Sequence, residues 1–482
     1  MSWDAVVGVE THVELSTRSK MFCGCAVEFG APPNTLTCPV CLGLPGALPV
    51  TNRKAIEDLI SIGLALSCEV EDYSVFHRKN YFYADVPKNY QISQYDLPVC
   101  RDGHLDVTAD GETRRIGIER AHMEEDTGKS THLGDTGRIH AAESTLLDFN
   151  RSGVPLVEIV SRPDLRGATE ARVYAQELRN LVAELGVSDA RMEEGSIRFD
   201  ANVSIRPEGA DELGTKVEIK NMNSFRSLER AIAYEVERQV EATEGGETII
   251  QETRHWDEEA GVTHSMRTKE GSSDYRYFTD PDLVPMEPGR TWIEEIGSRL
   301  PELPAARRAR YVDEGLEDGL AGVLSSAPPR LRAVYAEAVG AGAPPRLAAG
   351  WLVGEVTAWA RREDIDLEAL AITGDQLTEL VAIVEEGLVS SSAAKEVLDG
   401  VLSGEGSPRA VAEGRDLVQI SETAELAPVV EAVIAAHPDA VESYRAGEHK
   451  AIGFLVGQVM RETGGRADPG AVNEMLREAL SV

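Results

Sequence analysis

The sequence predicts an α+β domain over residues 1–292 and an almost wholly helical region after it. Three observations indicate this division. Short stretches alternate apolar and polar residues with the period of two that is typical of strands, as in GVETHVEL at 8–15. Two helical patterns interrupt these stretches. Beyond residue 292 the composition changes to Ala, Leu, Glu and Arg with helical spacing.

The expected elements follow in chain order. Strands rich in β-branched residues are expected at 154–161, 196–206 and 215–220. The first helix should follow Thr169 and end at Gly186, a typical C-terminal stop. The second helix should lie near Ile232, after the turn-like NMNS at 221–224.

The helical region is expected to contain two domains. SGEGSP at 403–408 is rich in Gly, Ser and Pro, so it should separate a helical domain at 293–405 from a small helical tail domain at 406–482. The last helix should begin at Asp468-Pro469, because a capping residue followed by proline is a common helix start.

The composition limits the classes of function. The chain has 48 Lys and Arg against 82 Asp and Glu, a net charge of −34, which argues against broad non-specific binding of nucleic acid. The amino terminus has no signal-peptide pattern, and no apolar run is long enough to span a membrane. The sequence therefore predicts a cytoplasmic protein without membrane contact.

Four of the six cysteines are close together in the sequence. Cys23 and Cys25 form a C-x-C pair, and Cys38 and Cys41 form a C-x-x-C pair twelve residues later. Two such pairs complete a tetrahedral shell of four sulfur atoms, which suits Zn²⁺ and leaves no open position for a substrate. Structural zinc is the favoured interpretation, and unliganded or redox-active thiols are the alternative.

A zinc-dependent deaminase is a second interpretation of the same region. His12-Val13-Glu14 followed by Cys38-Pro39-Val40-Cys41 is similar to the deaminase pattern H-x-E with P-C-x-x-C. That pattern has proline at the position of Thr37, and Cys23 with Cys25 would occupy the open coordination position. The deaminase interpretation is therefore the weaker one.

Two acidic segments are candidates for chemistry. GIERAHMEEDTGKSTH at 117–132 places Glu124, Glu125 and Asp126 beside His122, either as a solvated turn or as oxygen ligands for Mg²⁺. Glu158 interrupts an apolar strand, so it either faces water from a half-exposed strand or is buried and then paired or metal-bound.

One segment combines basic and aromatic residues. FHRKNYFYADVPKNYQISQ at 76–94 contains Lys79 and Lys88 together with Tyr81 and Tyr83. These residue types suit phosphate, adenine or a nucleotide sugar, although aromatic residues in strands also serve packing alone.

Taken together, these segments resemble the B subunit of the tRNA-dependent amidotransferase, the GatB family. The resemblance runs in order from residue 8 to about 460. It rests on GVETHVEL, RKNYFYADVPKNYQISQ, HMEEDTGKSTH, NRSGVPLVEIVSRPD, RMEEGSIRFDANVSIRP, KNMNSF, DYRYFTDPDLVP and KAIGFLVGQVM.

The resemblance implies a carbon–nitrogen ligase that acts in two half-sites. An amidase subunit, GatA, releases ammonia from glutamine, and the small subunit GatC completes a heterotrimer. GatB uses ATP and Mg²⁺ to phosphorylate the side-chain carboxylate of mischarged Glu-tRNA(Gln), Asp-tRNA(Asn) or both, and ammonia then gives Gln-tRNA(Gln) or Asn-tRNA(Asn). The competing class is a non-catalytic tRNA-binding scaffold whose kinase site has decayed.

The resemblance also implies roles for individual residues. The expected Mg²⁺ ligands are Glu10, His12, Glu125 and Glu158, with Glu14 as a further candidate and Glu124 more simply solvated. Lys79, Tyr81, Tyr83 and Lys88 should lie at the ATP site and channel mouth, where a Lys88–Glu125 ion pair would gate ammonia. A pattern of polar residues that alternate along one strand also fits contacts to phosphate and substrate, without individual roles: Arg198, Asp200, Asn202, Ser204 and Arg206.

The family's fold completes these expectations. It implies a cradle domain with an antiparallel sheet like that of glutamine synthetase, a helical domain, and a YqeY-like tail that binds tRNA. Lys450 and the small-residue face of Gly453 and Gly457 are candidate tRNA contacts in the tail. Close helix packing is the alternative for the two glycines.

Overall fold

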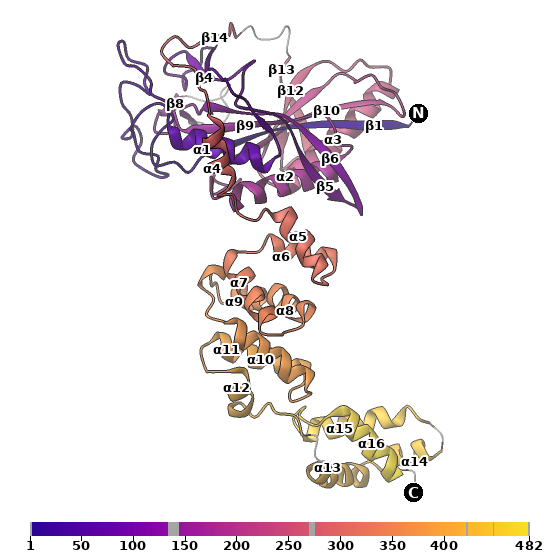
Figure 1. The fold of residues 1–482 in the computed structure, drawn as a ribbon. Coiled ribbons are helices and arrows are strands. Elements are labelled where there is room, and N and C mark those ends of the chain that lie inside the picture. The colour runs from indigo at the N-terminus through magenta and orange to yellow at the C-terminus, as the bar shows by residue number, and fades with distance from the viewer. Residues whose placement is uncertain (1, 134–143, 269–274, 421–422, 447, 481–482) are drawn as a thin grey trace. The chain divides into compact units, whose positions relative to one another are not determined.

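The computed structural model describes residues 2–133, 144–268, 275–420, 423–446 and 448–480. The chain divides into two compact units, Met1–Pro304 and Ala305–Val482. The first unit combines sheets and helices and the second is helical, so the predicted α+β class with a helical C-terminal region is confirmed (Figure 1). The finer boundaries at 292/293 and 405/406 stay predictions.

The first unit is built on a nine-stranded sheet in the order β13-β12-β11-β10-β1-β9-β6-β5-β2. Neighbouring strands are antiparallel except β11 and β12, so the sheet is mixed and not wholly antiparallel as expected. The strands are β1 (Trp3–Glu14), β2 (Glu69–Val70), β5 (Cys100–Ala109), β6 (Glu112–Glu125), β9 (Pro155–Ser161), β10 (Ile197–Pro207), β11 (Val217–Met222), β12 (Glu252–Asp257) and β13 (Val262–Thr268).

The helices of this unit bury the apolar side of the sheet. They are α1 (Arg53–Ala65), α2 (Ala168–Glu184), α3 (Phe225–Glu244) and α4 (Arg290–Gly297). Helix α2 begins one residue before Thr169 and ends before Gly186, close to where the sequence predicts it. It buries Tyr174, Leu178 and Val182 in the core. The apolar positions of β1 join the same core, because alternate residues of a strand point to opposite faces. The polar positions of β1 are therefore left on the other face.

A small sheet lies next to the end of β6. It has the order β14-β3-β4, with β3 (His77–Asn80), β4 (Tyr90–Ser93) and β14 (Phe278–Thr279). A separate hairpin consists of β7 (Lys129–Leu133) and β8 (Ser144–Asp148). The segment 16–52, which we call the cysteine loop, contains no helix or strand longer than an isolated bridge.

The second unit contains two separate hydrophobic cores. One is formed by residues between Tyr311 and Ala412 and the other by residues between Leu426 and Leu480. Its helices are α5 (Pro304–Asp313), α6 (Asp318–Ser325), α7 (Pro329–Gly340), α8 (Pro345–Trp351), α9 (Thr357–Arg362), α10 (Gly374–Glu385), α11 (Ser391–Leu402), α12 (Pro408–Gly414), α13 (Thr423–Ala436), α14 (Pro438–Arg445), α15 (Ala451–Glu462) and α16 (Pro469–Leu480). A π-helix, Leu352–Val356, and a 3₁₀-helix, Leu367–Ala369, complete the unit.

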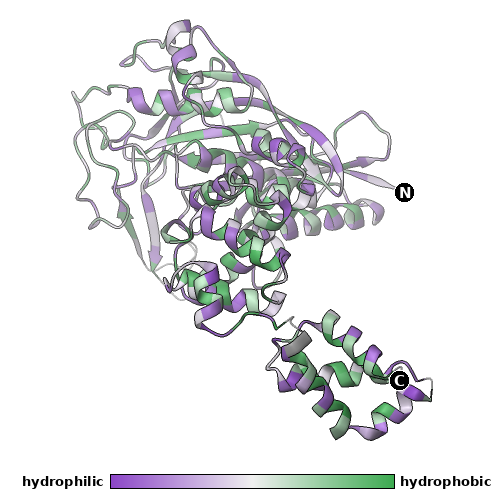
Figure 2. Ribbon diagram, turned by 60° about the horizontal axis from the view of Figure 1, so that its bottom comes forward, coloured by the Kyte–Doolittle hydropathy of each residue, from purple (hydrophilic) through white to green (hydrophobic). Residues whose placement is uncertain are grey.

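The helices of the second unit mix hydrophilic and hydrophobic residues along their length (Figure 2). Helix α16 starts at the predicted Asp468-Pro469, and Val472, Leu476 and Leu480 are buried. Among the residues that the structure describes, no helix has both the length and the apolar character needed to cross a bilayer.

Candidate functional site

The polar face of the central sheet gathers most of the predicted site residues. β1 places His12 opposite Arg198 of β10 on one side and opposite Glu158 of β9 on the other. β9 in turn places Glu158 opposite His122 of β6. Directly opposed residues of neighbouring strands share a face, so four strands contribute side chains to one surface.

Four side chains on this surface form what we call the histidine–carboxylate group: His12, His122, Glu124 and Glu158. Oε2 of Glu158 lies 3.7 Å from Nε2 of His12 and 3.4 Å from Nε2 of His122. Ligand atoms of His12, Glu124 and Glu158 all lie within 4.8 Å of one another, a spacing that suits one metal ion. Glu158 is buried and paired, which excludes the alternative of a strand residue that faces water.

Sequence reasoning ranked Glu124 below Glu125 as a ligand and gave His122 no role, but the structure places both in the group. Glu124 was expected to be solvated, but it is 3% exposed and accepts hydrogen bonds from Ser93 Oγ (2.7 Å) and Gln91 Nε2 (3.2 Å). The segment 117–125 belongs to β6 and is not a solvated turn. The period of two along β6 was the available signal, because it puts His122 and Glu124 on one face and Glu125 on the other.

Glu125 does not join the histidine–carboxylate group. Its Oε1 accepts a hydrogen bond from the amide of Ile92 at 2.9 Å and forms an ion pair with Lys88, so the predicted Lys88–Glu125 pair is present. Both side chains are buried, at 7% and 5% exposure. Glu10 precedes His12 by two residues on the same face of β1, but it lies outside the group. It accepts a hydrogen bond from Asn202 Nδ2 at 2.9 Å.

Neighbouring charges shift the pKa values of Glu124 in this group and of Lys79 beside it. Burial would lower the pKa of Lys79, but carboxylates led by that of Glu124 raise it above its usual range. Burial would raise the pKa of Glu124, but Lys79, His122 and His12 lower it below its usual range. Both residues are therefore charged at neutral pH, and Glu124 is in the ionised form that a metal requires.

A second set of charged residues lies on the same polar face, near the C-terminal end of β1. Arg198 lies 3.0 Å from Asp126 Oδ2 and 3.9 Å from Glu14 Oε1, and Arg151 lies 3.6 Å from Asp126. Burial, and then the charge and hydrogen bond of Asp126, raise the pKa of Glu14 to about 8. Glu14 therefore keeps its proton at neutral pH, while the two arginines stay paired with Asp126.

The remaining predicted residues of β10 lie further along the strand. Asp200 accepts from Lys220 Nζ at 2.5 Å, and Asn202 holds Glu10. Arg206 pairs with Asp4 at 3.7 Å, at the opposite end of β1 from His12, so the structure does not bring it to the group.

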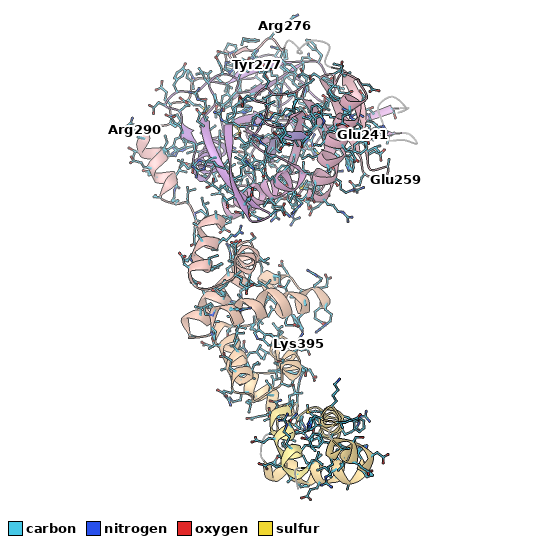
Figure 3. The ribbon with its side chains drawn as sticks, turned by 90° about the vertical axis from the view of Figure 1, so that its right-hand side faces the viewer. Glu241, Glu259, Arg276, Tyr277, Arg290 and Lys395 are labelled. Atoms are coloured by element: carbon cyan, nitrogen blue, oxygen red, sulfur yellow. The ribbon has the colours of Figure 1, made fainter. Side chains whose placement is uncertain are left out.

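Aromatic residues border the small sheet. The Tyr81 hydroxyl lies 3.3 Å from Gln91 Oε1, and the Tyr81 ring contacts those of Tyr83 (5.8 Å) and Tyr275 (6.1 Å). Tyr277 stacks on Tyr95 at 4.4 Å and lies at the upper margin of the first unit (Figure 3). Lys79 Nζ lies 5.2 Å from the Tyr275 ring centre, so these phenols surround the cation.

The four clustered cysteines form a separate group. The sulfur atoms of Cys23, Cys25, Cys38 and Cys41 lie within 4.8 Å of one another, so they can hold one metal ion. The amide of Cys38 donates to Cys41 Sγ at 3.1 Å. The hydrogen bond from the Cys23 thiol outweighs burial and lowers the pKa of Cys41 to about 4.

His12 is not part of the cysteine group, because it belongs to the histidine–carboxylate group. A deaminase would need this histidine and two of the cysteines around one zinc ion. The geometry does not support that interpretation.

The tail presents its candidate tRNA contacts at the surface. Lys450, Gly453 and Gly457 are exposed, and a Cβ added at either glycine would meet no atom within 4 Å. Close helix packing therefore does not explain the two glycines among the described residues.

Comparisons with known proteins cover both units. Residues 5–294 match the family model described as the GatB/GatE catalytic domain, and residues 333–480 match the one described as the GatB domain. Three similar proteins are each named as the B subunit of an aspartyl/glutamyl-tRNA(Asn/Gln) amidotransferase. The relative from Thermosynechococcus vestitus is 51% identical, with 100% of this chain and 97% of the relative aligned. Those from Carboxydothermus hydrogenoformans and Thermobifida fusca are 49% and 50% identical, with 99% and 100% of this chain and 99% and 94% of the relatives aligned.

Proposed function

Because the chain belongs to the GatB family, we propose that it is the B subunit of a tRNA-dependent amidotransferase that makes Gln-tRNA(Gln), Asn-tRNA(Asn) or both. It phosphorylates the side-chain carboxylate of the mischarged aminoacyl-tRNA with ATP and then converts it to the amide. The relatives are named as subunits, which supports partner subunits. We propose an amidase, GatA, and a small subunit, GatC, as these partners in the cytoplasm.

The histidine–carboxylate group is the observation that carries this proposal. Its two carboxylates and its imidazoles fit a divalent cation, and we propose that His12, Glu124 and Glu158 hold Mg²⁺, with Glu10 as a further ligand on the same face. When bound with ATP, Mg²⁺ neutralises charge on the phosphates during phosphoryl transfer. Glu125 is proposed as the partner of Lys88 and no longer as a ligand.

The chain's own residues supply the remaining electrostatics. Lys79 stays protonated beside the group and offers a cation to the phosphates. Arg198, held by Asp126, and Asp200, Asn202 and the tyrosines Tyr81 and Tyr83 extend a polar surface for nucleotide and substrate.

The reaction needs two displacements. In the first, a carboxylate oxygen of the substrate attacks the γ-phosphorus of ATP, and ADP leaves. In the second, the lone pair of ammonia attacks the acyl carbon, phosphate leaves with the electron pair of the broken C–O bond, and the new amide loses a proton. Ammonium has no lone pair, so ammonia must arrive uncharged. We propose that the buried Lys88–Glu125 pair controls its passage.

The other parts of the chain have supporting roles. We propose that the first unit is a cradle related to glutamine synthetase, and that Cys23, Cys25, Cys38 and Cys41 hold structural Zn²⁺. The YqeY-like tail binds tRNA, with Lys450 and the exposed face of Gly453 and Gly457 as contacts.

The test is tRNA-dependent ATP cleavage by the chain purified with its amidase and small subunits. Glu158→Gln and Glu124→Gln each remove one charge from the group, so we expect the rate to fall about 100-fold. Glu119→Gln is the matched control, because Glu119 is an exposed residue of β6, the strand that also carries Glu124. The Glu119 side chain forms an ion pair with Arg120. Its rate should stay within about twofold of the unchanged chain, as for most surface substitutions.

Two outcomes contradict the proposal. If Glu158→Gln keeps full ATP cleavage, the site is assigned wrongly. If the unchanged complex binds mischarged tRNA but cleaves no ATP, the chain is the non-catalytic scaffold.

A further inference from the structure

A cavity of about 200 Å³ is lined by residues of the cysteine loop and by the Lys88–Glu125 pair. Its lining includes Cys23, Cys41, Gly43, Lys88, Glu125 and Gly153. Two of the four clustered cysteines and both members of the ion pair therefore border the same space. The role proposed for zinc above, that of a structural ion, does not explain why the cysteines are placed here.

Lys88 contacts the cysteine loop at Phe22 and Gly43 and the strand β4 at Tyr90. Its ammonium lies 6.0 Å from the ring centre of Phe22 and 5.4 Å from that of Tyr90. Gly43 has φ = +66°, and a Cβ added to it would overlap Cγ of Lys88 and lie 3.1 Å from Cβ of Lys88. The backbone at Gly43 thus lies directly on the stem of Lys88 and leaves no space for a side chain.

The turn that carries two cysteines also fixes Gly43. The amide of Cys38 donates to Cys41 Sγ (3.1 Å), the amide of Gly43 donates to Val40 O (3.0 Å), and that of Leu44 donates to Pro39 O (2.8 Å). These bonds connect the positions of Cys38, Cys41 and Gly43 within seven residues of chain. A metal ion that fixes the sulfur atoms therefore also fixes the wall against Lys88.

The cysteine centre also approaches the other member of the pair. Gly153 has φ = +86°, and a Cβ built on it would lie 3.5 Å from Cβ of Cys41 and 3.9 Å from Oε2 of Glu125. The backbone of Gly153 makes two hydrogen bonds. Its carbonyl accepts from the amide of Met21 (2.8 Å), and its amide donates to Asp126 O (2.9 Å). Met21 of the cysteine loop and Asp126, which follows Glu125 in the chain, are thus joined through one glycine.

The part of the cysteine loop that carries Cys38 and Cys41 has no core of its own. The loop is attached at Met21, which is buried in the core of the first unit, and through Asn34, whose side chain bonds to Leu147 O and to the amide of Phe149. It contains no helix or extended strand, and it exposes Phe29, Leu44, Leu48 and Val50, at 82%, 50%, 64% and 74%. A segment of this kind without a core of its own depends on cross-links such as a metal ion for a fixed conformation.

We propose that the four-cysteine centre, with its metal ion bound, positions Lys88 against Glu125, so that ammonia transfer depends on the centre while phosphoryl transfer does not. Lys88 and Gly43 are positioning residues in this arrangement. The inference rests on the proposed function, in which the pair controls the passage of ammonia.

Two glycines of the same loop provide a matched test. Gly43→Ala places a methyl group where Lys88 lies, whereas Gly46→Ala has a similar positive φ of +84° and meets no atom within 4 Å. The backbone strain is therefore similar in both variants, and only Gly43→Ala displaces Lys88. Both are made in the full chain and assembled with the amidase and small subunits.

The first readout is hydrogen exchange at the amide of Ile92, which donates to Glu125 Oε1 at 2.9 Å. The second is the amount of amidated tRNA formed per ATP cleaved. We expect Gly43→Ala to speed exchange at Ile92 and to lower the product per ATP at least about tenfold, because misplacing a group by about 1 Å can cost about 100-fold. Gly46→Ala should match the unchanged chain in both. Equal behaviour of the two variants overturns the inference.

The metal is tested with Cys41→Ser, and Cys68→Ala serves as the control because Cys68 is a buried cysteine outside the cluster. Cys41→Ser should lose the zinc that elemental analysis finds in the unchanged chain and should show the fast Ile92 exchange of Gly43→Ala. Zinc loss with unchanged Ile92 exchange overturns the inference. If Cys41→Ser does not fold, the two glycine variants decide.

Failure of the proposed function is separable from failure of this inference. An unchanged complex that shows no tRNA-dependent ATP cleavage contradicts the proposed function. The exchange rates at Ile92 in the glycine and cysteine variants still test the coupling in that case.

Discussion

Glu124 and Glu125 are neighbours in the chain but lie in different environments. Glu124 faces Ser93, Gln91 and the two histidines, while Glu125 faces Lys88 on the opposite side of β6. Successive side chains of a strand point to opposite faces, which separates these two carboxylates. Because both are buried, each needs a counter-charge or hydrogen-bond donors. A one-residue shift in register would exchange the two roles.

His77 makes the stability of the first unit depend on pH. Burial lowers the pKa of His77, although Asp96 at 3.2 Å opposes this. Below the ordinary histidine pKa of about 6.5, the unfolded chain therefore binds a proton that the folded chain does not bind. The contribution of neutral His77 to the free energy of unfolding is therefore fully present above that pH, and it is lost as the pH falls below it.

We expect His77→Asn to reduce this pH dependence. The difference in the free energy of unfolding between the unchanged chain and the variant should shrink as the pH falls from about 7.5 to about 5.5. Urea denaturation of both proteins at several pH values measures it. A difference that stays constant or grows toward acid pH would contradict the assignment.

At the scale of elements, Asn52 joins the cysteine loop to α1. Its Oδ1 accepts from the amides of Lys54 (3.0 Å) and Ala55 (3.4 Å) as the cap of the helix. Its Nδ2 donates to the carbonyls of Ser19 (3.0 Å) and Lys20 (3.2 Å). One side chain thus starts α1 and fixes the first turn of the loop.

Two substitutions of Asn52 separate these functions. Asn52→Ala removes both sets of bonds, and we expect the free energy of unfolding to fall by about 2 kcal/mol. Asn52→Asp keeps an acceptor for the cap but loses the donor, so about 1 kcal/mol should be lost. Chemical denaturation checks both values. If the two variants are equally stable, the bonds to Ser19 and Lys20 contribute nothing.

At the scale of the whole molecule, the chain consists of two units with independent cores. The first core lies on the apolar face of the central sheet, and the second unit has two helical cores of its own. Each unit is large enough to bury the apolar area that a stable domain needs.

Separate chains of residues 1–304 and 305–482 should therefore each fold. We expect each to unfold cooperatively, with a midpoint within about 5 °C of the matching transition in the full chain. Calorimetry of the three proteins compares the midpoints. Absence of a transition in either piece would show that its stability depends on the other unit.

Several features of the fold and the site follow from local sequence. The period of two in 8–15 predicted β1, the helical spacing after Thr169 predicted α2, and the spacing of Cys23, Cys25, Cys38 and Cys41 predicted their grouping. These patterns depend on residues close in the chain, so one sequence is enough to recognise them. The resemblance to the GatB family added the expected roles of His12 and Glu158 and the Lys88–Glu125 pair.

The sequence by itself thus determined the class of each unit, the strands β1, β9, β10 and β11, the helices α2, α3 and α16, the cysteine group and the family. Only the tertiary structure decided that Glu124 and His122, and not Glu125, face His12, that Arg206 lies at the far end of β1, and that Gly43 lies on Lys88. The physical reason is that periodicity sets which side of a strand a residue faces. Pairing between strands that are distant in sequence, and close contacts between a loop and a sheet, set which residues meet.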